Sequence, residues 1–356
     1  MPKNENHFVP HTYLKAFKSA CRRIHLYNLK RSLAKEHVSL KQQCRKHKFY
    51  GPTQNTEDAL CDLENHIGPV LHDIAATKTL SPIGTEAYAI LLGFVALQIL
   101  RTPSAANRVN MLTDKMMKEA YSRDPRFAGE IETLELAYEN AVLMSLKNLP
   151  FAIDSISDLH AHLIASPTNS FFTSDNPAFK YNLYCEKIQY MGTTGLLSRG
   201  FQIFLPLTPR FHLMFYDPVV YRVPSVRLSM ATPSDVDVLN GMQIVSADEN
   251  VYFSDWNQLQ RIRQSDARFR RHRKSDPIAV RETGQDDDPN RSLLHAFERT
   301  PYLKLELSFL SVNRRARRVP LEDRAVYRKE ISMPQLPEPP HLQGRRITFS
   351  RFIGER

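Results

Sequence analysis

The spacing of hydrophobic positions changes along the chain, from alternation near the start to a helical period in the middle. Residues 23–27, Arg-Ile-His-Leu-Tyr, are apolar at every second position, which predicts a strand of a small β-hairpin after a short helical segment at 12–18. From residue 56 apolar side chains recur three and four positions apart, which predicts a helix. By the same pattern we expect further helices at 84–101, 130–146, 155–165 and 234–242.

Short aromatic and β-branched runs return after Pro167 and predict strands. They cover residues 171–173, 201–207, 211–216 and 250–253. Helices in the middle with strands at both ends predict an α+β fold, in which a helical centre packs on a mixed or antiparallel sheet and a basic C-terminal extension follows. Pro103 is expected either to kink the helix before it or to open the next one.

The domain organisation follows from where the pattern becomes polar. We expect one α+β domain over residues 1–256, a basic polar linker over 257–295 and an extension, disordered in part, over 296–356. The polar run at 268–291 is the main reason for expecting a linker, and residues 301–312 fit a strand or an extended tail equally well.

Charge suggests an acidic partner. The chain of 356 residues has a formal net charge of +10, and many of its arginines lie in the last third. Nucleic acid, bound through this basic C-terminal third, is therefore the expected partner. The four cysteines have no metal or redox spacing, the start has no signal peptide, and the most apolar stretch is too short to cross a bilayer. We therefore expect a cytoplasmic protein with no membrane partner.

Several common catalytic motifs are absent. The sequence has no glycine-rich phosphate loop, no His-Glu-x-x-His helix and no Gly-x-Ser-x-Gly elbow. A P-loop nucleotidase, a dinucleotide-dependent dehydrogenase and an α/β-hydrolase are therefore poor fits.

Three short polar motifs at the edges of apolar segments are the candidate site. His7 precedes Phe-Val-Pro, Arg101 precedes Thr-Pro, and Asp175 lies in Thr-Ser-Asp-Asn-Pro. The imidazole of His7 suits a general base or a metal ligand, Arg101 suits an anion clamp, and Asp175 suits a metal ligand or base. Each also has a structural alternative, namely a surface histidine, a helix-capping arginine and a turn aspartate.

Other polar residues near these motifs complete the candidate set. Gln98 shares a helical face with Arg101 and is expected to orient it, and Ser174 and Asn176 flank Asp175. Glu64, in an acidic patch most simply explained as a solvated face, is a weaker third metal ligand beside His7 and Asp175.

In their order and spacing these motifs resemble a bacterial domain of unknown function, family 4238, over roughly residues 5 to 255. The resemblance rests on the following segments: His7 to Phe17, Phe49-Tyr50, Gln98 to Pro103, Thr173 to Pro177, and Leu205 to Pro209. Asn240 falls where that family tends to carry an asparagine before its last strand. The family has no settled activity, so the resemblance implies only that these polar residues belong to one pattern.

Two functions from different classes follow. The first is a hydrolase for a phosphate-bearing substrate such as nucleic acid, a metal-dependent phosphodiesterase or nuclease using Mg²⁺ or Mn²⁺. In it His7, Arg101 and Asp175 are catalytic, His7 and Asp175 hold the metal, and Gln98, Ser174, Asn176 and Asn240 support the substrate. The alternative is a non-catalytic module that binds nucleic acid or a protein, in which the same residues form a buried structural network. We expect the three motifs to converge in either case.

Overall fold

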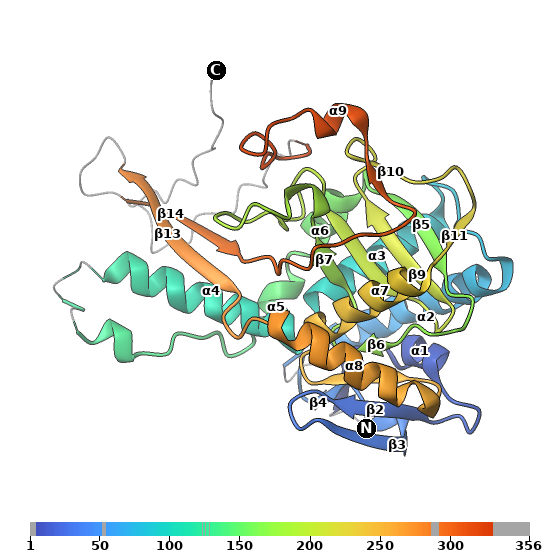
Figure 1. The fold of residues 1–356 in the computed structure, drawn as a ribbon. Coiled ribbons are helices and arrows are strands. Elements are labelled where there is room, and N and C mark those ends of the chain that lie inside the picture. Colours follow the sequence, from blue (N-terminus) through green and yellow to red (C-terminus); the bar gives the residue numbers. More distant parts are fainter. Residues whose placement is uncertain are drawn as a thin grey trace.

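The computed structural model describes residues 5–51, 55–122, 124, 126–127, 129–285 and 292–329 (Figure 1). These residues form an α+β fold with mixed and antiparallel sheets, as the sequence predicts.

The four-stranded sheet joins strands from near the N-terminus with strands from residues 173–174 and 250–253. Its order is β3 (Leu33–Val38), β2 (Ile24–Asn28), β12 (Asn250–Phe253) and β6 (Thr173–Ser174), and all its pairs are antiparallel. β2 therefore pairs with a strand that lies more than two hundred residues later, which confirms a sheet built from both ends of the segment.

The five-stranded sheet carries most of the core. Its order is β11 (Leu228–Met230), β5 (His160–Ala165), β9 (Phe211–Tyr216), β8 (Gln202–Pro206) and β7 (Phe179–Tyr181). Only the β11–β5 pair of this sheet is parallel. Every residue of β8 and β9 is buried, because both faces of the sheet are covered.

Alternation along β8 assigns the two faces of this sheet. Ile203 and Leu205 pack with α3 (Glu86–Leu100) in one core cluster, whereas Phe204 between them packs with α7 (Pro233–Ser246) in another. The sheet is thus the middle of three layers, with α7 on the opposite side from α3 (Figure 1).

The remaining elements are short strand pairs, helices and single 3₁₀ turns. The strand pairs are β1 (Glu5–His7) with β4 (Arg45–His47), β10 (Tyr221–Arg222) with β15 (Ser311–Val312), and β13 (Ile278–Gln285) with β14 (Ser292–Glu298). The helices are α1 (His11–Leu14), α2 (Asn55–Thr77), α4 (Pro103–Tyr121), α5 (Ala141–Leu146), α6 (Leu149–Ile156), α8 (Leu259–Phe269) and α9 (Arg314–Arg317). The 3₁₀ turns are η1 (Lys15–Phe17), η2 (Leu40–Gln42), η3 (Ile131–Thr133), η4 (Leu183–Cys185), η5 (Trp256–Gln258) and η6 (Arg270–His272).

Pro103 opens a new helix. Thr102 caps α4 by accepting a hydrogen bond from the amide of Ala105, and Pro103 occupies the first helical position, where no amide is needed. α3 and α4 meet at 56°. Within the described residues no single helix is both long and apolar enough to span a membrane, and this bent pair meets the test only when its two helices are taken together.

Two predicted helices are wrong. Over 130–146 only η3 and α5 form, because the side chains of Asp114 and Asn110 accept hydrogen bonds from the amides of Leu136 and Tyr138 and hold that stretch extended. Over 155–165 the chain leaves α6 at Ile156 and becomes β5, which pairs with strands on both sides. In both places tertiary partners override the local pattern.

The linker expected at 257–295 is also corrected within the described residues. Residues 259–269 form α8, and 278–285 pair with 292–298 in a hairpin, while residues 286–291 lie outside the described part. α8 packs tightly because Gly241 of α7 has no side chain, and a Cβ there would lie 2.5 Å from the ring of Phe269. The polar composition of this region reflects exposed faces of folded elements.

The beginning of the expected extension also packs on the body. Leu305, Leu307 and Phe309 are buried in the cluster that contains α7. Of residues 301–312, for which the sequence fits a strand and a tail equally well, only 311–312 form a strand. Residues 330–356 of the expected extension lie outside the described part.

Candidate functional site

Arg101 lies at the end of α3 and is 1% exposed. Each of its three guanidinium nitrogens donates a hydrogen bond to protein: Nε to the hydroxyl of Tyr50 at 3.1 Å, Nη1 to Glu64 Oε1 at 2.9 Å, and Nη2 to the carbonyl of His7. Burial lowers the pKa of Arg101, but Tyr50 and Glu64 more than offset this and raise it. The guanidinium is thus a charged, bonded centre of the interior.

His7 meets Arg101 through its backbone. Its carbonyl accepts from Arg101 and from the hydroxyl of Tyr50 at 3.0 Å, while its imidazole Nε2 lies 3.3 Å from the carbonyl of Lys41. Burial lowers the pKa of His7, so the ring is neutral near pH 7. The carboxylate of Glu64 forms an ion pair with Arg101, which links it to the carbonyl of His7.

Asp175 is buried at the end of β6 and binds backbone amides. Its Oδ1 accepts from the amide of Asp248 at 2.7 Å, and its Oδ2 accepts from Glu249 at 2.9 Å and Asn250 at 2.8 Å. Burial raises the pKa of Asp175 to about 7, against the pull of these amides. The carboxylate therefore fixes the turn that leads into β12.

The supporting residues of this motif bind α7. Ser174 Oγ donates to Gln243 at 2.9 Å, and Asn176 Nδ2 donates to the carbonyl of Ser246 at 2.9 Å. Asn240 lies apart, bridging the carbonyl of Ser170 and the amide of Phe172.

Gln98 does not orient Arg101. It is fully buried, and within the described part of the chain neither its Nε2 nor its Oε1 has a hydrogen-bond partner. Tyr50 and Glu64 hold the guanidinium instead, so the predicted role of Gln98 is corrected.

Except for Gln98 and Asn240, the predicted residues form two linked networks. His7, Glu64 and Arg101 make one, and Ser174, Asp175 and Asn176 make the other. Thr102, next to Arg101, joins them by donating from its hydroxyl to Asn176 Oδ1 at 3.0 Å. Mg²⁺ or Mn²⁺ between His7 and Asp175 would compete with three amides for both carboxylate oxygens, so this oxygen set suits amide binding better than metal binding.

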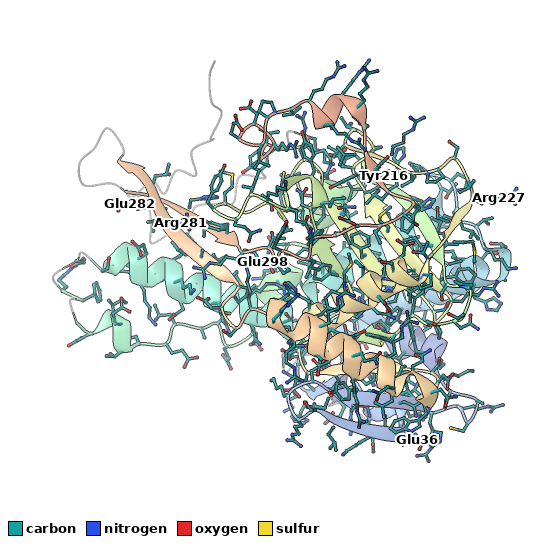
Figure 2. The ribbon with its side chains drawn as sticks, viewed as in Figure 1. Glu36, Tyr216, Arg227, Arg281, Glu282 and Glu298 are labelled. Carbon is teal, nitrogen blue, oxygen red and sulfur yellow. The ribbon has the colours of Figure 1, made fainter. Side chains whose placement is uncertain are left out.

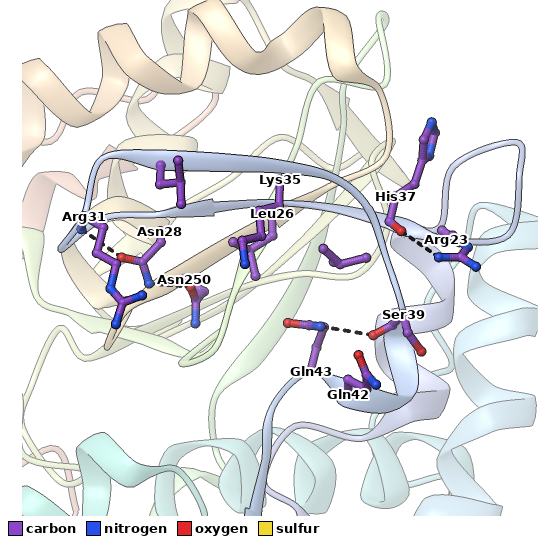
Figure 3. Close-up of a pocket in the computed structure, with 12 residues that line it drawn as sticks. Arg23, Leu26, Asn28, Arg31, Lys35, His37, Ser39, Gln42, Gln43 and Asn250 are labelled. Atoms are coloured by element: carbon purple, nitrogen blue, oxygen red, sulfur yellow. Dashed lines mark hydrogen bonds between the residues drawn. The ribbon is translucent and has the colours of Figure 1, made fainter.

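A pocket of about 570 Å³ lies beneath the β2–β3 hairpin, and we call it the hairpin pocket (Figure 3). Its lining residues come from the β2–β3 hairpin with its turn and the residue before it, from the segment that includes η2, and from the start of β12: Arg23, Leu26, Asn28, Arg31, Leu33, Lys35, His37, Val38, Ser39, Gln42, Gln43 and Asn250. Three of these are cations, one is a histidine, and none is a carboxylate. The volume is within the usual range for a ligand site.

Asn250 connects the hairpin pocket with the buried motif. Its backbone amide donates to Asp175, and its side-chain Oδ1 accepts from Asn28 Nδ2 at 2.8 Å on the pocket wall. Asp175 thus positions a residue of the pocket without facing it. Spacing along the chain did not point to this pocket, because Asn250 reaches it only through the pairing of β12 with β2.

The basic residues after Trp256 are engaged to a large extent within the fold. Arg261 pairs with Asp237, Arg270 pairs with Asp266, and Arg273 donates to the carbonyls of Ile244 and Asp248. The two ion pairs offset the charges of Arg261 and Arg270 locally, and the carbonyl contacts hold the guanidinium of Arg273 against the fold.

A known protein family matches the region of the chain that contains these motifs. Residues 5–257 match the family described as "Protein of unknown function (DUF4238)", and the chain belongs to that family. The matched region ends just after β12, so it contains both networks and the hairpin pocket. Searches of curated proteins and of solved structures found no match for the chain.

Proposed function

We propose that this protein binds nucleic acid through the hairpin pocket, which holds the phosphate backbone. One observation carries this proposal: the pocket wall has three cationic side chains, Arg23, Arg31 and Lys35, and no carboxylate. Arg23, Arg31 and Lys35 are all exposed there, so their charge acts on solvent and on approaching anions.

The cationic groups have different roles in this proposal. Arg23 Nη1 donates to the carbonyl of His37 at 3.1 Å, which holds its guanidinium against β3. Arg31 lies at the turn of the hairpin and Lys35 lies opposite Leu26 on β3, and both supply the phosphate contacts. The formal charge of +10 adds long-range attraction for a polyanion.

The amides of the pocket suit the same ligand. Gln42, Gln43 and Asn250 line the wall beside the cations. Carboxamides donate to phosphate and sugar oxygens and also to base edges, so they complement arginine and lysine without adding negative charge.

The hydrolase hypothesis has less support from the geometry. It requires Arg101 and Asp175 to meet a substrate, but both are nearly fully buried and are bonded to protein groups. A binding module with these residues as its internal framework therefore ranks first. Incubation with DNA, RNA and nucleotides in Mg²⁺ or Mn²⁺ distinguishes the two, since turnover that is lost in Asp175→Asn while the fold is retained would favour the hydrolase.

Fluorescence anisotropy with labelled single-stranded and double-stranded oligonucleotides tests the binding proposal. Arg31→Ala/Lys35→Ala should raise the dissociation constant by roughly tenfold or more, because two phosphate contacts are lost. The matched control is Lys147→Ala/Arg227→Ala, which removes the same charge from exposed positions that do not line the pocket.

Equal weakening by the two double variants would contradict the proposal, because binding would then follow net charge alone. Absence of oligonucleotide binding by the wild-type protein at low salt would also contradict it.

A further inference from the structure

Three metal-ligating side chains gather on the outer part of the same hairpin. His25 belongs to β2, and Glu36 and His37 are consecutive residues of β3. Figure 2 shows Glu36 on the hairpin, at the edge of the molecule. Figure 3 shows the imidazole of His37 directed away from the pocket residues. His37 also lines the hairpin pocket, and its carbonyl holds Arg23, but the metal-ligating side chains are not the proposed phosphate contacts, Arg31 and Lys35.

A β-bulge brings the cluster together. The β2–β3 register shifts between Ile24 and Leu26, and His37 has a φ of 52° at this irregularity. In a regular strand Glu36 and His37 would point to opposite faces. The bulge and the left-handed backbone of His37 turn both side chains toward His25.

The distances suit one cation. A ligand atom from each of the three residues lies within 4.8 Å of the other two, and His37 Nε2 is 3.1 Å from Glu36 Oε1. Ligands at about 2.0 to 2.2 Å from a tetrahedral ion lie roughly 3.4 Å apart. The Glu36–His37 pair is close to that spacing, and a ligand atom of His25 lies within 4.8 Å of both.

We propose that His25, Glu36 and His37 bind a divalent transition-metal ion of the Zn²⁺ class. Two imidazoles and one carboxylate favour such an ion over Mg²⁺ or Ca²⁺, which prefer oxygen ligands. A three-residue set leaves a position of the metal open to water or another ligand.

The surroundings of His25 support this site. Its ring is buried, with the rings of Phe253 and Trp256 at centroid distances of 5.4 and 5.3 Å. Its Nδ1 accepts only a long bond, 3.3 Å, from the amide of His37, so the ring loses little by turning toward a cation. The carboxylate of Asp255 adds negative charge nearby.

The single tryptophan of the chain provides the test, since Trp256 lies against His25. Titration of the metal-free protein with Co²⁺ should quench its fluorescence with saturation at one equivalent, and Zn²⁺ should compete and reverse the quenching. His37→Ala and Glu36→Gln, both at exposed positions, should weaken the apparent affinity by about 10- to 100-fold. His72→Ala, an exposed histidine on α2, is the matched control and should leave it unchanged.

Circular dichroism of each variant confirms that the fold is retained before titration. Absence of quenching in the wild type at millimolar Co²⁺ would overturn the proposal, and so would equal quenching in the His37 and Glu36 variants. Because oligonucleotide binding is measured separately on Arg31 and Lys35, failure of the metal site leaves the binding proposal standing, and the reverse also holds.

Discussion

Thr102 Oγ1 donates a 3.0 Å hydrogen bond to Asn176 Oδ1, joining two motifs that lie 74 residues apart in sequence. The same hydroxyl caps α4. One side chain thus fixes the start of a helix and the position of the Ser-Asp-Asn-Pro segment, which in turn contacts α7.

Replacement of Thr102 by valine tests this dual role. Thr102→Val removes a helix cap and leaves the buried amide oxygen of Asn176 unpaired, so the free energy of unfolding should fall by about 2 to 4 kcal/mol. Thr85→Val, at the exposed cap of α3, removes a cap without a tertiary partner and should cost about 1 kcal/mol. Urea denaturation measures both, and equal losses would show that the link to Asn176 contributes nothing.

Arg101 is expected to act as a structural centre. Arg101→Met removes three donors and leaves Glu64, Tyr50 and the carbonyl of His7 without their common partner, which should destabilise the fold by about 3 to 5 kcal/mol. Arg263→Met, at an exposed position of α8, should change stability by less than about 0.5 kcal/mol. A stably folded Arg101→Met protein that has lost only an activity would contradict this account and favour the hydrolase.

Two buried glutamines should respond oppositely to the same substitution. Gln98→Met removes an amide with no partner in the described part of the chain and should stabilise by about 1 to 3 kcal/mol. Gln243→Met should destabilise by a similar amount, because Gln243 accepts from Ser174 and donates to the carbonyl of Pro177. If thermal denaturation shows that Gln98→Met also destabilises, Gln98 holds a buried water or ligand.

Asp175 should make stability depend on pH. Its pKa rises from the ordinary value of 3.8 to about 7 on folding, because it is buried. Between these values the folded protein binds more protons than the unfolded chain, so this contribution to the unfolding free energy falls as pH rises from about 4 to 7 and is constant above that. Asp175→Asn lacks this titration. The unfolding free energy of the wild type minus that of Asp175→Asn should therefore decrease as pH rises across that window. An increase with pH would contradict the raised pKa.

The sequence predicts elements better than it predicts partners. The helices at 86–100 and 233–246 and the strands β8, β9 and β12 follow from local pattern, because each buries one or two continuous apolar faces. β5, by contrast, lies where the local pattern predicts a helix. The local pattern over 130–146 predicts a helix, because the side chains of Asn110 and Asp114 that bond Tyr138 and Leu136 lie 28 and 22 residues earlier and do not enter that pattern.

The same limit applies to the site. Grouping His7, Arg101 and Asp175 from their motifs identified polar residues of linked networks, but spacing does not reveal that Arg101 bonds a backbone carbonyl or that Asp175 binds three amides. The sequence gives no reason to select Arg31 and Lys35, because exposed cations are common. They line a pocket only because β2 pairs with both β3 and β12, which brings the hairpin next to Asn250.

The most direct test of the central claim is the salt dependence of oligonucleotide binding by the wild type and by Arg31→Ala/Lys35→Ala. If the buried motifs form a framework and the hairpin pocket holds the phosphates, the slope of log K against log salt should decrease in magnitude by about two units in the variant, with an unchanged melting temperature. An unchanged slope would place the phosphate contacts elsewhere and contradict the account.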